Sequence, residues 1–189
     1  MLVSNCIKSG IALSFCAMFL SGTLAAAQSA SPNQSIASLS YVEPLDVDTL
    51  DALKALYKQL IVAENRHDLV AVKRLVWESP STLFVAKTAT PAEGNWAGFW
   101  GSDVVMQHFH DLYQETFRID PDYSKEKIVG LTMDVAETYV PVKITVAYAG
   151  QTPVPKPFLM ILDWVRTPIG WKMATDIALP IPPAPPQPN

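Results

Sequence analysis

The chain has 189 residues, of which 49% are hydrophobic and 17% charged, and it carries 14 basic against 18 acidic side chains. This length suits one ordinary domain with a sizeable core, and an acidic balance without a basic stripe argues against a nucleic-acid partner. The two cysteines, Cys6 and Cys16, both lie near the N-terminus. If that segment is removed, disulfides, thiolate nucleophiles and cysteine metal sites are excluded.

The first residues predict an export signal. Residues 1–27 carry a lone Lys8, an apolar run over residues 11–20 and small residues ending at Ala27. This order is typical of a secretory signal peptide, and the apolar run is short for a membrane span. We therefore expect cleavage after Ala27 and a periplasmic or secreted protein with no membrane span after cleavage. An uncleaved signal anchor is the alternative.

The two flanks of the remaining chain are predicted to lie outside the domain. Residues 28–45 are rich in Ser, Ala, Asn and Gln and are expected to form a flexible leader. Residues 180–189 contain repeated prolines, which cannot donate hydrogen bonds to a sheet, so an extended polyproline tail is expected. Such a tail either docks on an aromatic groove or ends the last strand as a solvated terminus.

Three helices are expected before the main strands. The first covers residues 47–64 and is broken by residues 65–67, after which Asp68 caps a shorter helix. Ser102 or Asp103 is expected to cap the third. The apolar stripes consist of Leu50, Leu53, Leu56, Tyr57, Leu60 and Ile61 in the first helix and of Val105, Met106, Phe109, Leu112, Tyr113 and Thr116 in the third.

Strand patterns dominate the rest of the domain. Residues 81–87 predict a short strand followed by an irregular stretch, and residues 127–133 and 136–148 predict longer strands. Residues 158–177 predict a β-hairpin, because two apolar runs flank Thr167-Pro168-Ile169-Gly170, in which proline and glycine favour a tight reversal.

The expected register of this hairpin places two carboxylates together. Pairing Arg166 with Trp171 and continuing outward brings Ile161 opposite Asp176. Because side chains alternate along a strand, Asp163 and Asp176 would then share the outer face of the sheet with Lys172. A turn one residue longer would change this pairing.

The order of these elements resembles the nuclear-transport-factor-2-like superfamily, which includes the SnoaL-like cyclases and the ketosteroid isomerases. The similar stretches are AENRHDLVAVKRLV, GSDVVMQHFHDLYQ and GWKMATDIAL, and the resemblance spans a domain of residues 46–179. It implies an α+β fold in which a curved antiparallel sheet wraps around three helices to form a cystatin-like cone. The superfamily includes isomerases, dehydratases and cyclases that need no cofactor, and also binding or assembly modules.

Three residues are candidates for proton transfer. His110 lies at the flank of the apolar stripe of the third helix, and Asp163 and Asp176 interrupt apolar strands. The alternatives are a boundary histidine and outer-face carboxylates paired with Lys172. His108 and His110 are two residues apart and point to different sides of a helix, so no metal site is expected. His108 is expected to be solvated.

The ketosteroid-isomerase mechanism itself fits the chain poorly. The strand region that carries its base in that family offers Lys87 here, and Glu78 and Glu93 beside it accompany turn or loop signals.

Aromatic residues are the candidate ligand contacts. Tyr57, Trp96, Trp100 and Tyr113 could line the mouth of a cone and suit a flat apolar ligand, or they could pack as a lid on the core. We therefore expect a domain that binds a small apolar molecule, forms a homodimer through the outer sheet face and uses no cofactor. Whether it is an enzyme stays open at this point. The alternative is a non-catalytic periplasmic assembly or interaction module.

Overall fold

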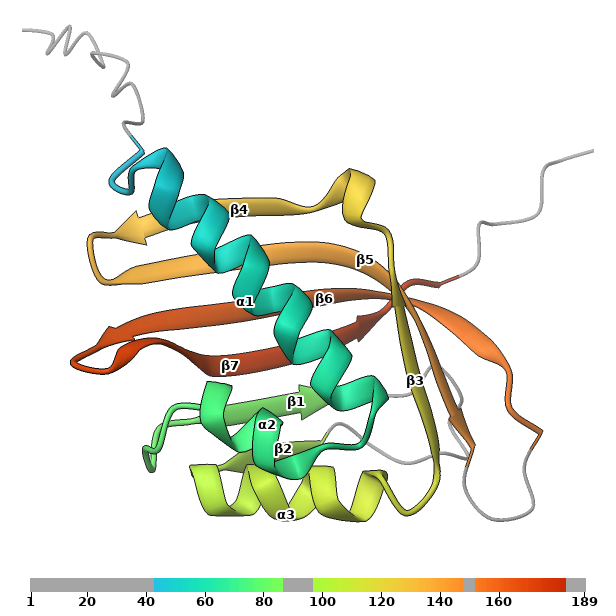
Figure 1. Ribbon diagram of the computed structural model, residues 1–189. Helices are drawn as coiled ribbons and strands as arrows, with labels where there is room; N and C mark the ends of the chain where they lie inside the picture. Colours follow the sequence, from blue (N-terminus) through green and yellow to red (C-terminus); the bar gives the residue numbers. More distant parts are fainter. Residues whose placement is uncertain (1–42, 87–96, 148–151, 183–189) are drawn as a thin grey trace, which may run out of the picture. The chain divides into compact units, whose positions relative to one another are not determined.

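The computed structural model describes residues 43–86, 97–147 and 152–182 (Figure 1). The chain divides into two compact units, Met1–Ser40 and Tyr41–Asn189, and every described residue belongs to the second. The expected signal peptide, most of the leader, most of the proline tail and Trp96 lie outside the described residues.

The helices form where their sequence patterns predicted them. Asp46 caps α1 (Val47–Asn65) by accepting a hydrogen bond from the Thr49 amide at 2.7 Å, and Asp68 caps α2 (Leu69–Leu75) in the same way through Ala71. The third helix, α3 (Ser102–Leu112), follows Gly101 as its N-cap and has no side-chain cap, so the prediction of Ser102 or Asp103 as the cap was wrong. It also ends earlier than its stripe suggested, so Thr116 belongs to a strand. No helix in the described part of the chain has both the length and the apolarity of a membrane span.

Seven strands form a single sheet. They are β1 (Leu83–Ala86), β2 (Ala97–Trp100), β3 (Thr116–Pro121), β4 (Lys127–Thr132), β5 (Val135–Ala147), β6 (Pro155–Thr167) and β7 (Gly170–Pro180), with a short 3₁₀ turn, η2 (Tyr123–Lys125), before β4. The order across the sheet is β2-β1-β7-β6-β5-β3, and β4 also pairs with β5. Every pairing is antiparallel except that of β1 with β7, which is parallel. The sequence patterns had not predicted β2, β3 or this parallel pairing.

One face of the sheet is covered by helices. In Figure 1, α1 runs diagonally across the sheet, while α2 and α3 lie beside the edge formed by β1 and β2. The largest side chains buried between these layers are Trp164, Tyr57, Phe109, Leu53 and Leu60. The predicted α+β architecture is confirmed, with the correction that its sheet is mixed at one strand pair.

A β-bulge in β7 changes the predicted register. Trp164 faces Met173 as expected, but its neighbour Asp163 faces Thr175, so Ala174 is an extra residue in β7. The predicted pairing is therefore right from the turn to Trp164 and wrong beyond it. Asp176 consequently points into the core and Ile177 points away from it, the reverse of the expectation.

Candidate functional site

The most unusual feature of the core is a pair of buried carboxyl groups. Glu64 in the last turn of α1 is 0% exposed, and Asp176 on β7 is 1% exposed. None of their four carboxyl oxygens has a hydrogen-bond partner among the described residues. Buried polar groups in native proteins are normally satisfied, so an unpaired carboxyl pair marks this place as a candidate site.

The sheet places Asp176 in a row of inward-facing residues. Asp176 pairs with Phe84 on β1 and with Leu162 on β6, and Leu162 pairs in turn with Thr138 on β5. The bulge brings Asp176 into this row. Thr138 is occupied by accepting a hydrogen bond from the Trp164 indole at 2.9 Å, so Asp176 is the polar group of the row that is left without a partner.

Two tyrosines share the electrostatic environment of the pair. Tyr57 lies two turns before Glu64 on α1, and its hydroxyl contacts the Met160 sulfur at 3.7 Å. Tyr113 follows α3, and its buried hydroxyl has no hydrogen-bond partner among the described residues. Burial raises the pKa of both phenols above their usual range, and the charges of Glu64 and Asp176 raise it further. Both tyrosines therefore stay protonated and can donate hydrogen bonds.

The carboxyl pair holds protons more tightly than ordinary acidic residues. Burial raises the pKa of Glu64 well above its usual range, and the nearby Asp176 charge raises it again. Burial raises the pKa of Asp176 to about 7. Glu64 also stands at the C-terminal end of α1, where the helix dipole disfavours a negative charge. The two groups titrate as a pair, and both favour the protonated form more than exposed carboxyls do.

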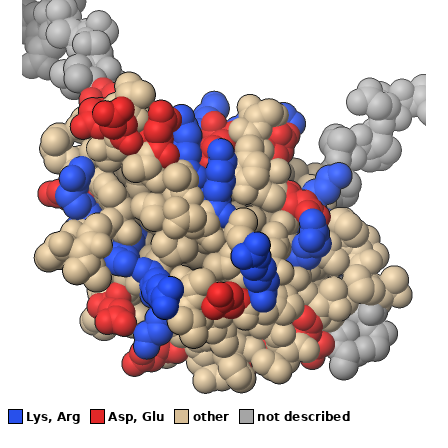
Figure 2. All heavy atoms as spheres, viewed as in Figure 1, with Lys and Arg blue, Asp and Glu red and all other residues tan. Residues whose placement is uncertain are grey.

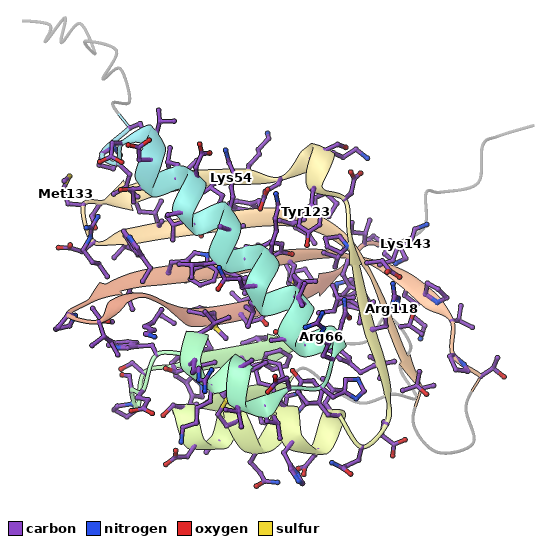
Figure 3. All side chains as sticks on the ribbon, viewed as in Figure 1. Lys54, Arg66, Arg118, Tyr123, Met133 and Lys143 are labelled. Carbon is purple, nitrogen blue, oxygen red and sulfur yellow. The ribbon has the colours of Figure 1, made fainter. Side chains whose placement is uncertain are left out.

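The helix break after Glu64 anchors this end of the site. The Asn65 side chain accepts from the Ile119 amide and donates to the Ile119 carbonyl, each at 2.7 Å, and so ties α1 to β3. His67 adopts a positive φ of 54° that ends the helix. Its ring stacks on Tyr113 at 4.8 Å and contacts the Phe117 carbonyl at 3.1 Å. Figure 3 shows Arg66 and Arg118 where the end of α1 approaches β3.

The middle of α1 carries a second tyrosine contact. Tyr123 from η2 packs edge-on against Tyr57 with ring centroids 6.2 Å apart, and Figure 3 shows it beside α1. The Tyr123 ring is partly exposed and carries Lys58 above its face. Acidic and basic side chains are interspersed over this side of the protein (Figure 2).

These groups can exchange protons with a bound molecule. A carboxyl whose pKa lies near neutrality can both give and take a proton, and a protonated phenol can hold an oxygen or nitrogen in place. The surrounding core is apolar. Within the described residues, no group of three or more His, Cys, Asp or Glu side chains is arranged to hold a metal ion.

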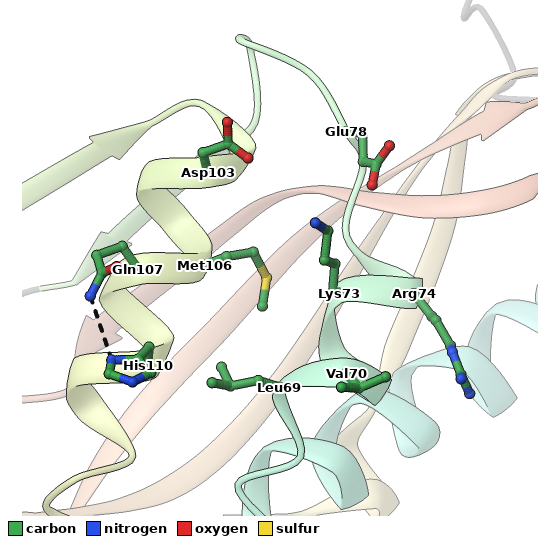
Figure 4. Close-up of a pocket in the computed structure, with 9 residues that line it drawn as sticks. All are labelled: Leu69, Val70, Lys73, Arg74, Glu78, Asp103, Met106, Gln107 and His110. Carbon is green, nitrogen blue, oxygen red and sulfur yellow. Dashed lines mark hydrogen bonds between the residues drawn. The ribbon is translucent and has the colours of Figure 1, made fainter.

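The predicted proton-transfer residues lie in three different places. His110 is exposed on α3 and contacts Asp111 at 3.1 Å. It lines an open groove of about 560 Å³ between α2 and α3, across which Met106 and Leu69 point toward each other (Figure 4). Asp163 lies on the outer sheet face, and only Asp176 reaches the core. The structure does not bring His110 together with either aspartate.

The outer-face aspartate has its own polar neighbours. Burial raises the pKa of Asp163, a hydrogen bond from Thr175 lowers it, and the neighbouring Glu137 raises it. Glu137 is the residue opposite Asp163 on β5, and it also hydrogen-bonds Tyr139. Lys172, the expected partner of Asp163, instead donates to the Arg74 carbonyl.

The aromatic residues predicted to contact a ligand also lie in different places. Tyr57 and Tyr113 belong to the buried site, whereas Trp100 on β2 is 63% exposed. His108, expected to be solvated, is half-buried because its ring stacks on Phe99 at 4.0 Å and lies 4.7 Å from Phe84. Burial lowers its pKa.

Sequence reasoning missed Glu64. Its position carried a usable signal, because Leu53, Tyr57, Leu60 and Glu64 are spaced four, three and four residues apart and share one face of α1. A charged residue on an apolar stripe is the sequence sign of a buried acid. Asp176 was found, but only the bulge explains why it faces inward.

Comparisons with known proteins identify solved structures that have a similar fold. No protein-family model matches the chain, and no curated protein matches it significantly. A proposed aromatic ring hydroxylase from Novosphingobium aromaticivorans is similar over 74% of this chain and 93% of its own, with a TM-score of 0.60 and 15% identity. A ketosteroid isomerase-like protein from Erwinia carotovora atroseptica is similar over 73% and 100%, with a TM-score of 0.57 and 15% identity.

A third structure belongs by name to the NTF2-like family. It is a proposed dehydratase from Streptomyces avermitilis, similar over 71% of this chain and 97% of its own, with a TM-score of 0.56 and 16% identity. The chain has the NTF2-like, cystatin-like fold. At these identities the likeness shows the NTF2-like fold alone, so the chemistry has to be inferred from the residues of this chain.

Proposed function

We propose that this NTF2-like chain binds a small, mostly apolar molecule beneath α1 and exchanges a proton with it through Glu64 and Asp176. One observation carries the proposal, namely two fully buried carboxyls without a hydrogen-bond partner among the described residues. Retaining such a pair costs stability, so it is expected to serve a purpose other than packing. The names of the dehydratase and the isomerase-like protein support the same reaction class.

Each group has a distinct role in this scheme. Asp176, whose pKa lies near 7, moves the proton, because it can populate both protonation states at neutral pH. Glu64 keeps its proton and donates a hydrogen bond, and Tyr57 and Tyr113 orient the ligand as further donors. Isomerisation and dehydration are reactions that such groups support without a cofactor.

The test uses whatever molecule the protein retains. Native mass spectrometry of the purified protein should detect a bound compound. When the complex is incubated in D₂O and the compound is then released, the compound should carry deuterium bound to carbon. Asp176→Asn should abolish the deuterium uptake, whereas Asp163→Asn, a matched change on the outer face of the same sheet, should not. A protein that retains no compound, or deuterium uptake that persists without Asp176, would contradict the proposal.

The outer face of the sheet favours a second role, in which it binds another copy of the chain or another protein. Its strands present half-buried apolar side chains to the side that carries no helix, namely Leu159, Ile161, Val165, Ile177 and Leu179. We propose that this face joins two copies of the chain in a homodimer.

Export to the periplasm or medium is proposed from the N-terminal pattern. The intact mass of the protein recovered from those fractions should correspond to a chain that begins at Gln28.

A further inference from the structure

We infer that the ligand of the Glu64–Asp176 site is an amine that binds as a cation on an apolar body. This deepens the proposed binding function, on which it rests, by assigning the charge of the ligand. The geometry that points to it is a buried site whose charged side chains, Glu64 and Asp176, are both acidic.

The site contains acids without a compensating cation. The buried polar or charged residues among those the structure describes, apart from the tyrosines, are Glu64, Thr82, Thr138, Thr145 and Asp176. None of these is a lysine, arginine or histidine. Ionisation of the pair therefore leaves a negative charge that no buried basic side chain of the described core neutralises.

The surroundings of the pair add to this negative potential. Glu64 lies in the last turn of α1, which contains no basic residue, so the negative end of the helix dipole falls at the site. The charged groups that act on the two tyrosines from outside the pair are Asp68 and Glu126, both acidic. His67, which follows the end of α1, stacks on the Tyr113 ring, and its Nε2 is engaged by the Phe117 carbonyl.

The available atoms match an ammonium group. The site offers four carboxyl oxygens without partners, and an ammonium carries three N–H donors. A carboxylate or phosphate ligand would be repelled once the pair ionises and could only accept hydrogen bonds from the tyrosine hydroxyls or a protonated carboxyl, and an alcohol would supply one donor but no charge.

Binding of such a cation has a proton balance that can be measured. The amine enters with its proton, one carboxyl of the pair ionises to form the ion pair, and the displaced proton leaves to solvent. No covalent bond changes in this step. The signature is therefore the release of up to one proton for each amine bound at neutral pH.

The experiment compares three head groups on each of two aromatic ring systems. Benzylamine, benzyl alcohol and benzoate, and the same three head groups on naphthalene, are titrated calorimetrically at pH 7 in two buffers of different ionisation enthalpy. We expect the amine to bind at least about tenfold more tightly than the alcohol, the anion not to bind, and only the amine to release a proton.

Variants test whether the carboxyl pair is the cause. Glu64→Gln and Asp176→Asn are each expected to weaken amine binding by about tenfold or more and to remove the proton release, with alcohol binding changed by less than about twofold. Asp163→Asn serves as the control and should leave all three probes unchanged. Circular dichroism confirms that each variant is folded, and either of the two pair variants alone suffices for the comparison.

The outcomes separate the two proposals. Tighter binding of the alcohol or benzoate than of the amine would overturn the cation inference and leave the binding function standing. A co-purified compound without a basic nitrogen would do the same. Failure of every probe, together with a protein that retains no compound, would overturn both.

Discussion

At the scale of single residues, Glu64 and Asp176 are expected to make the stability of the fold depend on pH. A group that keeps its proton in the folded state and loses it in the unfolded state makes folding pH-dependent. The pKa of each carboxyl is raised on folding. The folded chain therefore binds more protons than the unfolded chain, and stability decreases as the pH rises.

This sign gives a first prediction. The free energy of unfolding should fall between about pH 4, where an unfolded aspartate begins to ionise, and pH 7, where the folded Asp176 does. Each unit of pKa difference contributes about 1.4 kcal/mol. Asp176→Asn should flatten the decline when stability is measured by urea denaturation across this range.

The matched control is Asp103→Asn, because Asp103 is an exposed carboxylate near the start of α3. It should leave the pH dependence of the wild type unchanged. A wild-type stability that rises from pH 4 to pH 7 would contradict the assigned burial of the pair.

At the scale of elements, the bulge in β7 decides which residues face the core. Ala174 is an extra residue that has no partner on β6. Deleting it would therefore leave every other side chain of β7 on its present face of the sheet. Deletion of Ala174 should therefore leave Asp176 buried and the fold intact, with a modest decrease in melting temperature followed by circular dichroism.

Deletion of Ile177 is the contrasting variant. It would turn Ala178 and the residues after it to the opposite face, so a large loss of stability or failure to fold is expected. If the two deletions destabilise the protein equally, the bulge is not located at Ala174.

The elements that sequence patterns could predict are those with a strong period of their own. The apolar stripe of α1 and the Pro-Gly turn of the last hairpin are local signals, and both are confirmed. β2 is four residues long and depends on β1, and β3 is held by Asn65 from another element, so neither has a sufficient local signal. The bulge is likewise a consequence of packing, and it moved Asp176 from the predicted outer face to the core.

At the scale of the whole molecule, the proposed homodimer can be tested on the outer sheet face. Ile161 lies in the middle of this face, between Tyr139 on β5 and Ile177 on β7. A stable interface typically covers about 800 Å² on each partner, so a charge at its centre is disruptive. The wild type should sediment as a dimer and Ile161→Asp as a monomer in analytical ultracentrifugation.

Val104→Asp provides the control, because Val104 is an exposed apolar residue on α3, away from that face. It should sediment like the wild type. A monomeric wild type at high protein concentration, or an unchanged dimer in Ile161→Asp, would refute the assignment of the interface.

The position of β7 also determines when the site can exist during synthesis. β7 is the last strand along the chain, yet it lies inside the sheet between β1 and β6. A ribosome must therefore complete about residue 178 before β1 gains its parallel partner and Glu64 meets Asp176. Until then the backbone N–H and C=O groups on the edge of β1 that later pairs with β7 have no strand partner. The acid pair therefore cannot assemble until the last strand of the chain has been made, and a nascent chain truncated before β7 would lack Asp176.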